Sequence, residues 1–255
     1  YGVDPNYFCP PISQKYEKRR VSICSKRNHF VMSRPSGPHV QSLLYFATSD
    51  LYPRCPYDIT FIFDNFKLLK VLDLESINMG SSFPTEVQLL VRLRFLALCG
   101  DIDTIPASIS NLRVLESLLV KGLKGKVLLP YTLWSMEKLR HVHVNNYAAI
   151  ALQDSESTSS SQALNLVSLS CPYLLCGKGT EDIMRKLLKL QKLSCVFSEL
   201  RDDSGKCNHF PVLNFLTELE SLNVLYSGRI ALPCKFEFPL NLKKLTLSKF
   251  RLPWD

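Results

Sequence analysis

The chain lacks the features that mark membrane-spanning, glycosylated or phosphate-binding proteins. No apolar run in its 255 residues approaches the roughly 20 that a membrane-spanning helix needs. No basic segment followed by an apolar one opens the chain as a signal peptide would. No asparagine lies in an N-x-[S/T] sequon, and the lone Gly-x-x-Gly at residues 122–125 lacks the P-loop pattern. We therefore expect no transmembrane segment and no nucleotide site in this chain.

The cysteines also argue against a secreted protein. There are nine, an odd number, and none forms a C-x-x-C pair. Cys24, Cys99 and Cys195 fall inside strand patterns. Since disulfides persist mainly in oxidising compartments, this usage predicts free thiols and a cytoplasmic protein.

The charge is basic, with a formal net charge of +8. Basic residues gather at residues 15–27, 121–126 and 243–251. Such clusters suit nucleic acid, or a solvated surface that faces an acidic partner. Aromatic residues are not interleaved with the basic ones as base-stacking platforms require, so we expect no nucleic-acid partner.

One apolar pattern recurs along the chain. L-x-x-L-x-L, with valine allowed at the last two positions, begins at Leu69, Leu93, Leu115 and Leu139. A connector with one proline, Pro84, Pro106 or Pro130, precedes each of the last three copies. A period of about 20–29 residues with this spacing is typical of leucine-rich repeats. Further copies begin at Leu164, Leu190, Leu219 and Leu242, and two weaker strands at residues 19–24 and 40–46 bring the predicted strands to ten.

The pattern predicts an α/β repeat fold, a leucine-rich-repeat solenoid or horseshoe. It has a parallel β-sheet on the concave face and irregular, 3-10 or short helical connectors on the convex face. Residues 1–38 would form an irregular N-terminal junction or cap with a first short strand. Residues 39–255 would form the repeats, cut short at the C-terminus as in a piece of a longer protein, with a mobile Ser-rich loop at 153–162.

Two connectors carry helical signals, and one set of apolar residues predicts the core. Residues 59–66 read as a helical or 3-10 connector, and Thr180 as the N-cap of a helix through Leu190. A continuous buried stack is expected from Leu72, Leu96, Leu118, Val142 and Leu245.

The residues between the leucines predict a binding surface. Strand side chains alternate, so the leucines point inward and their neighbours outward onto the concave face. The expected partner-binding residues are Asp73, Glu75, Phe95, Lys121, His141, His143, Asn145, Lys192, Asn223 and Lys244. Ala97 falls in the same outward set. A face that mixes acidic, apolar and basic side chains suits a protein partner.

Catalytic and metal sites have little support. His141 and His143 lie two apart on one strand face, as a metal pair would, and Cys207 and His209 give the same signal in a polar loop. The pattern places no Cys, Asp or Glu beside His141 and His143. We therefore expect no metal site and no enzyme activity, and plain thiols at the neighbouring cysteines 171 and 176.

Several segments resemble one family. Residues 19–23 resemble the opening of the repeat domain in plant intracellular nucleotide-binding leucine-rich-repeat immune receptors, and residues 66–74 are similar to their first regular repeat. Residues 105–112 are similar to their proline-anchored connector. Residues 121–127 and 141–146 look closest to the late blight resistance proteins of potato, in the coiled-coil subclass.

This resemblance implies a function. In that family the repeat domain follows a coiled coil and an ATP/ADP-binding switch, holds the switch off, and helps to sense a pathogen effector directly or through a guarded host protein. Activation triggers defence and hypersensitive cell death. The partners would be the receptor's own nucleotide-binding and coiled-coil domains and the effector or guarded protein. No cofactor is expected in this chain, and the ATP/ADP site would lie in the nucleotide-binding domain.

The resemblance also suggests an intramolecular latch. The basic residues Arg19, Arg20 and Arg34 near the first strand would contact the switch. The full-length receptor would be cytoplasmic, with membrane association open. The chain departs from regular repeats because Ile77, Asp101, Leu123 and Tyr147 stand where an Asn or Cys ladder would follow each strand, so even curvature is not expected.

Two other classes of protein fit a leucine-rich repeat. A substrate adaptor of a ubiquitin ligase would need an upstream recruitment module such as an F-box. An extracellular receptor ectodomain would show sequons, paired capping cysteines and L-x-G-x-I-P repeats, of which only Ile105-Pro106 is present. A P-loop upstream in the full reading frame would instead support the immune-receptor interpretation.

Overall fold

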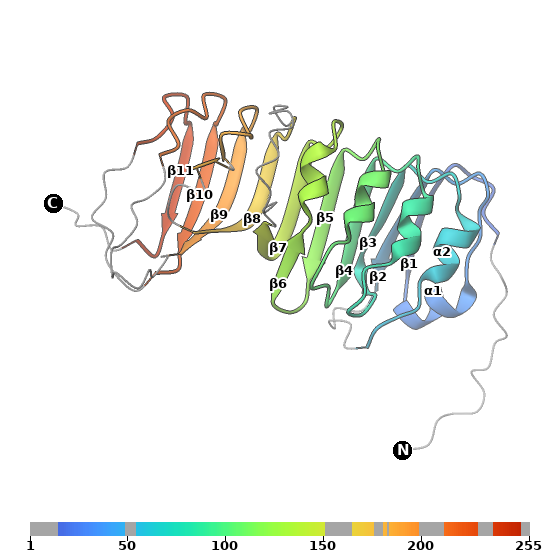
Figure 1. The fold of residues 1–255 in the computed structure, drawn as a ribbon. Coiled ribbons are helices and arrows are strands. Elements are labelled where there is room, and N and C mark those ends of the chain that lie inside the picture. Colours follow the sequence, from blue (N-terminus) through green and yellow to red (C-terminus); the bar gives the residue numbers. More distant parts are fainter. Residues whose placement is uncertain are drawn as a thin grey trace, which may run out of the picture.

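A single sheet runs through the computed structural model, which describes residues 15–48, 55–150, 165–175, 181–182, 184–198, 212–228 and 237–250. Eleven strands form the sheet, and every described pairing is parallel (Figure 1). The strands are β1 (Arg20–Ser25), β2 (Ser42–Ala47), β3 (Val71–Asn78), β4 (Phe95–Gly100), β5 (Ser117–Gly122), β6 (Lys126–Leu129), β7 (His141–Ile150), β8 (Ser168–Leu175), β9 (Lys192–Ser198), β10 (Ser221–Tyr226) and β11 (Lys244–Ser248). The predicted parallel sheet is confirmed.

Strand order follows chain order. The path β1-β2-β3-β4-β5-β7-β8-β9-β10-β11 contains the ten predicted strands. The short strand β6 was not predicted, and it pairs with the second half of β7, from Lys126 beside Tyr147 to Leu129 beside Ile150. The first half of β7 pairs with β5. One long strand thus serves two short neighbours, which the repeat pattern does not encode.

Proline sets three of the connectors. The 3-10 helices η1 (Thr85–Leu89), η2 (Ala107–Asn111) and η3 (Tyr131–Ser135) each follow a proline whose φ is −70° to −72°. The pyrrolidine ring imposes this φ, which suits the first turn of a helix. Each helix buries one apolar side chain, Val87, Ile109 or Leu133. The predicted short connectors are confirmed here, and the connector at 59–66 forms α2 (Thr60–Asn65).

A helix within residues 1–38 was not predicted. Helix α1 (Arg27–Ser33) has no side-chain cap and a left-handed C-cap at Arg34 with φ 40°. Its one buried residue, Phe30, packs against Tyr45 of β2 with ring centroids 4.4 Å apart and against Phe61 of α2 at 5.8 Å. Tertiary packing of one aromatic residue therefore stabilises a helix with no apolar periodicity of its own.

The helix expected through Leu190 is wrong in its extent. Residues 181, 182 and 184 are helical, and residues 185–190 are turn or irregular, while Thr180 lies outside the described residues. The N–H of Leu187 donates to the Met184 carbonyl at 2.9 Å, and that of Leu190 to the Leu187 carbonyl at 3.0 Å. The same two bonds join Val87, Leu90 and Leu93. Met184 and Leu187, whose apolar spacing contributed to the helix prediction, thus belong to the same kind of turn as in the other repeats.

The core is a continuous stack of central repeat residues. Leu72, Leu96 and Leu118 are 0% exposed and Val142 is 1% exposed, as predicted, and they lie side by side in the sheet register. Leu245 is 42% exposed, so its predicted burial is wrong. Within the described residues β11 pairs with β10 alone, so no further strand covers its outer side.

The helical connectors of the N-terminal half lie over one face of the sheet and leave the other face open (Figure 1). Within the described residues, no helix is long and apolar enough to cross a membrane. The predicted Ser-rich loop at 153–162 falls outside the described part of the chain.

Candidate protein-interaction surface

Two rows of side chains follow from the register of the sheet. The first row is Arg20, Ser42, Val71, Phe95, Ser117, His141, Ser168, Lys192, Ser221 and Lys244. The second row is Ser22, Leu44, Asp73, Ala97, Leu119, His143, Ser170, Ser194, Asn223 and Thr246. Side chains of alternate residues share one sheet face, so both rows lie opposite the leucine core. The structure thus brings most of the predicted binding residues onto one surface.

Glu75, Lys121 and Asn145 lie two residues beyond the second row along β3, β5 and β7. Lys121 Nζ lies 3.6 Å from Glu75 Oε1, so an ion pair joins β3 to β5 across β4. Asp73 Oδ1 accepts a hydrogen bond from the Glu75 N–H at 3.0 Å. Burial raises the pKa of Asp73 above its usual value, an effect that this hydrogen bond opposes.

Cys99 of β4 lies beside Lys121 of β5 in the register. Its side chain shares a face of the sheet with those of Phe95 and Ala97. It is 1% exposed, and burial raises the pKa of its thiol to about 11. Lys121 opposes that rise, and Glu75 adds to it. A thiol so held is protonated at neutral pH and a poor nucleophile.

Ala97 was expected to be exposed, and this expectation is wrong. It belongs to the second row, between Asp73 and Leu119, yet it is 0% exposed. A methyl group is shorter than both neighbours, so they cover it. Phe95, in the first row, is half-buried.

The two histidines differ. His141 is half-buried, with Nδ1 2.8 Å from Ser168 Oγ, whereas His143 and Asn145 are exposed. Within the described residues, no group of three or more His, Cys, Asp or Glu side chains could hold a metal ion. Cys207 and His209 lie outside those residues, as do the side chains of cysteines 171 and 176.

The C-terminal half of the surface is polar and basic. Lys192, Asn223 and Lys244 are exposed as predicted, and Asn223 Nδ2 donates to Ser194 Oγ at 3.3 Å. These three side chains lie on separate strands, β9, β10 and β11.

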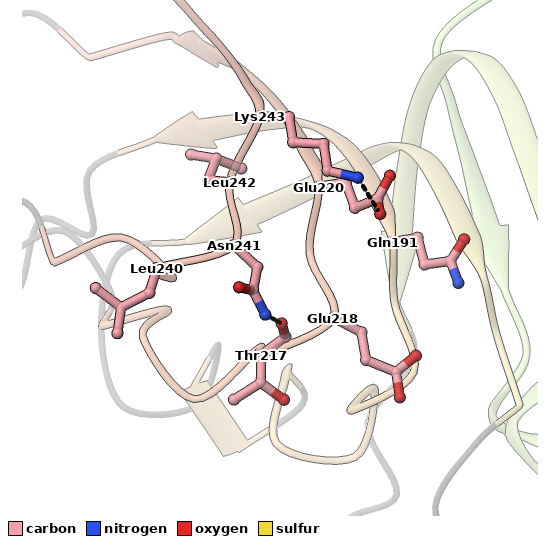
Figure 2. Close-up of a pocket in the computed structure, with 8 residues that line it drawn as sticks. All are labelled: Gln191, Thr217, Glu218, Glu220, Leu240, Asn241, Leu242 and Lys243. Carbon is pink, nitrogen blue, oxygen red and sulfur yellow. Dashed lines mark hydrogen bonds and ion pairs between the residues drawn. The ribbon is translucent and has the colours of Figure 1, made fainter.

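A hollow of about 580 Å³ lies at one edge of the sheet, where the chain leads into β9, β10 and β11 (Figure 2). Its lining residues are Gln191, Thr217, Glu218, Glu220, Leu240, Asn241, Leu242 and Lys243. Lys243 Nζ pairs with Glu220 Oε1 at 2.7 Å, and Asn241 Nδ2 donates to the Thr217 carbonyl at 2.7 Å. This hollow was not predicted, because its lining comes from turns about one repeat apart.

The three predicted latch arginines lie in the N-terminal repeat and are exposed. The Arg19 carbonyl accepts the N–H groups of Gln41 and Ser42, and Arg20 begins β1, the edge strand of the described sheet. Arg34 ends α1. Hydrogen bonds from Thr60 hold the pKa of Asp58 below its usual value, and the charge of Arg34 adds to this lowering.

Short parallel strands with two outward rows, a leucine core and 3-10 connectors define a leucine-rich-repeat protein. A family model described as a leucine-rich repeat region matches residues 49–254. The chain belongs to this leucine-rich-repeat family.

The curated relatives are plant resistance proteins. The chain is 35% identical over 238 residues to a putative late blight resistance protein homolog of Solanum demissum. The alignment covers 89% of this chain and 30% of that relative. It is 35% identical over 216 residues to a late blight resistance protein of Solanum demissum, covering 82% of this chain and 16% of that relative. The predicted resemblance to late blight resistance proteins is confirmed, and the chain spans less than a third of these relatives.

Solved structures support the fold. An internalin of Listeria monocytogenes matches with a TM-score of 0.53 at 15% identity, covering 89% of this chain and 59% of that one. A leucine-rich-repeat protein of Leptospira interrogans matches with a TM-score of 0.52 at 18% identity, covering 89% and 64%. These matches confirm the predicted solenoid class.

Proposed function

We propose that this chain is the recognition and autoinhibitory repeat domain of a plant disease-resistance receptor. The observation that carries the proposal is 35% identity to a late blight resistance homolog across 89% of the chain. The domain acts by binding and is not an enzyme. The receptor is cytoplasmic, and its ATP/ADP site lies in a nucleotide-binding domain outside this chain.

The concave surface binds the pathogen effector or the guarded host protein. Its exposed side chains change along the sheet from the acidic Glu75 to His143 and then to Lys192 and Lys244. A graded surface of this kind discriminates partners by charge and shape together. Extended concave surfaces are also the usual binding faces of solenoids.

The N-terminal repeat holds the nucleotide switch in its inactive state. Arg19, Arg20 and Arg34 are exposed and contact an acidic surface of the switch. Exposed ion pairs contribute at most about 1 kcal/mol each, so a few of them form a latch that one ligand can release. Effector binding favours the released state, which triggers defence and hypersensitive cell death.

The test is charge reversal in the full-length receptor. Arg19→Glu together with Arg20→Glu should cause cell death in leaves that express the receptor without any effector, at matched protein level. The matched control is Lys192→Glu with Lys244→Glu, which makes the same charge change on the other half of the sheet and should stay silent.

A second readout makes the result decisive. The separately expressed switch and repeat domains should co-precipitate, and the arginine reversal should weaken that interaction. Unchanged silence together with unchanged co-precipitation would remove these two arginines from the latch.

A further inference from the structure

Four successive turns carry a concentration of positive charge along one edge of the sheet. They are residues 67–70, 91–94, 113–116 and 137–140, and they lead into β3, β4, β5 and β7. The third residue of each turn is a buried leucine. The exposed cations are Lys67, Lys70, Arg92, Arg94, Arg113, Lys138 and Arg140, and the acidic side chains of these turns are Glu116 and Glu137. We call these four turns the basic edge.

Backbone hydrogen bonds hold the basic edge in a regular geometry. The N–H of Arg94 donates to the Lys70 carbonyl at 2.8 Å, that of Glu116 to the Arg94 carbonyl at 2.8 Å, and that of Arg140 to the Glu116 carbonyl at 2.9 Å. Adjacent strands lie about 4.8 Å apart, so each turn repeats its neighbour at that step. The turns follow one another along one edge of the sheet (Figure 1). Several turns can therefore contact one flat partner at once.

Most of these cations have no partner within the described chain. Lys67 pairs with Asp64 at 3.4 Å, and Arg94 Nε donates to Glu116 Oε1 at 3.0 Å. Within the described residues, no ion pair involves Lys70, Arg92, Arg113, Lys138 or Arg140. Their charge is available to an external anionic surface.

Aliphatic side chains are exposed among these cations. Val91 is 61% exposed beside Arg92, and Val114 is 40% exposed beside Arg113. Leu89, at the end of η1, is 55% exposed. Large aliphatic groups between long basic side chains are the composition of segments that bind the interface of an anionic bilayer.

The other end of the same edge is mixed in charge, because the turns into β9 and β11 carry Lys189 and Lys243 whereas the turn into β10 is acidic. Turn 217–220 carries Glu218 and Glu220, which line the hollow of Figure 2. A protein partner that inserts a side chain into a hollow would therefore bind at this end of the edge, away from the basic edge. The charge asymmetry along the edge therefore favours contact by the N-terminal half with a flat anionic surface.

We propose that the basic edge binds the surface of an anionic lipid bilayer. Lys and Arg side chains are attracted to the anionic headgroups, and Val91 and Val114 enter the interface. The concave surface stays open to a protein partner, since the basic edge lies at the margin of the sheet. This inference does not depend on the proposed function.

Vesicle co-sedimentation of the 255-residue chain tests it. The chain should bind vesicles of phosphatidylcholine with phosphatidylserine, and not vesicles of phosphatidylcholine alone. Raising the salt concentration should release it, because screening weakens attraction between exposed charges. Arg92→Glu with Arg113→Glu should lower the partition coefficient about tenfold or more, since each basic residue near an anionic leaflet adds to binding.

Three further variants separate the contributions. Lys26→Glu with Lys124→Glu makes the same charge change at exposed residues that follow β1 and β5, at the opposite edge of the sheet, and should leave binding within about twofold of the unaltered chain. Arg92→Lys with Arg113→Lys should also retain binding, because charge rather than guanidinium geometry is required. Val91→Ser with Val114→Ser should weaken binding several-fold with the charge unchanged. Circular dichroism checks that each variant is folded.

Three outcomes overturn the proposal. The first is absence of binding by the folded chain, and the second is equal binding to neutral vesicles. The third is that soluble polyglutamate binds the chain as tightly as the vesicles do at equal anionic charge, and that Arg92→Glu with Arg113→Glu abolishes this binding too. In that case the basic edge is a docking surface for an acidic protein.

Discussion

At the scale of the residue, each position of the repeat has one physical task. The central leucine fills the space between sheet and connectors, and Leu96 is 0% exposed between Leu72 and Leu118. Gly100 is constrained by backbone, because a Cβ there would lie 2.6 Å from the Gly80 carbonyl oxygen. Cys99 is constrained by burial, which controls its ionisation. Small changes at these three positions should therefore have distinct consequences.

Truncation of a core leucine tests the stack. Leu96→Ala should lower the free energy of unfolding by about 2–5 kcal/mol, since it removes a fully buried side chain and leaves a cavity. Urea denaturation followed by circular dichroism gives the value. The exposed Val91→Ala is the control, with an expected change within about 0.5 kcal/mol. Equal effects of the two substitutions would falsify the assigned register.

Gly100→Ala should also destabilise the chain, by about 1–3 kcal/mol, as expected for a methyl group forced into a filled site. The obstacle is backbone, since the Asp101 N–H donates to the same Gly80 carbonyl at 2.8 Å. The same denaturation assay measures it. A variant as stable as the parent would show that the two backbones can separate at this point.

The thiols give a prediction in pH. Burial raises the pKa of Cys99 to about 11, so its thiolate becomes abundant only as the pH rises toward that value. Cys24 and Cys55 are exposed. Alkylation by iodoacetamide at pH 8, followed by peptide mass spectrometry, should label Cys24 and Cys55 well before Cys99 in the folded chain. Denaturant should remove the difference, and its persistence in denaturant would contradict burial as the cause.

At the scale of the element, the connectors decide how the repeats differ. The three 3-10 helices each follow a proline. Another connector forms helix α1, which has no side-chain cap. Strand β6 lies in the connector between β5 and β7. In β6 the Leu128 N–H donates to the Asp103 carbonyl at 2.7 Å, and the Leu128 carbonyl accepts the Ile105 N–H at 3.0 Å. Since β6 also pairs with β7, its backbone joins residues 103–105 to that strand.

Leu128→Pro should therefore be costly although the side chain is 39% exposed. Proline removes the donor and leaves the Asp103 carbonyl unpaired, with an expected loss of about 1–3 kcal/mol. Leu128→Ala keeps the N–H and should cost less than about 1 kcal/mol. Thermal unfolding compares the two, and equal melting temperatures would show that the backbone bonds of β6 add nothing.

At the scale of the whole molecule, stability is the sum of neighbouring repeats and should vary along the sheet. The N-terminal repeats share an aromatic core of Phe30, Tyr45 and Phe61. At the other end of the described sheet, β11 pairs with β10 alone, and Leu245 is 42% exposed. The two ends are thus packed differently.

Hydrogen exchange should report this gradient. Backbone amides of β11 should exchange faster than those of β4, because local opening needs less energy where fewer side chains are buried. Exchange of the intact chain followed by mass spectrometry compares the two within one sample. Equal protection of β4 and β11 would mean that the sheet opens only as a unit.

The sequence by itself determined the repeat, its class and ten strands. Leucine spacing and strand alternation are local and periodic, so they predict both burial and the outward rows. The proline that precedes each 3-10 helix is also a local signal, because it predicts the helix from neighbouring residues alone. Residues such as His143 and Lys192 could therefore be placed in the outward rows from the pattern alone, and their role in binding a partner stays a prediction.

Only the tertiary structure decided what depends on neighbours distant in the chain. Helix α1 forms because Phe30 meets Tyr45 and Phe61, and Ala97 is covered because its neighbours are longer. Leu245 is exposed because β11 has one neighbour in the described sheet. The basic edge and the hollow each combine turns about one repeat apart, so they become surfaces only when the strands lie side by side.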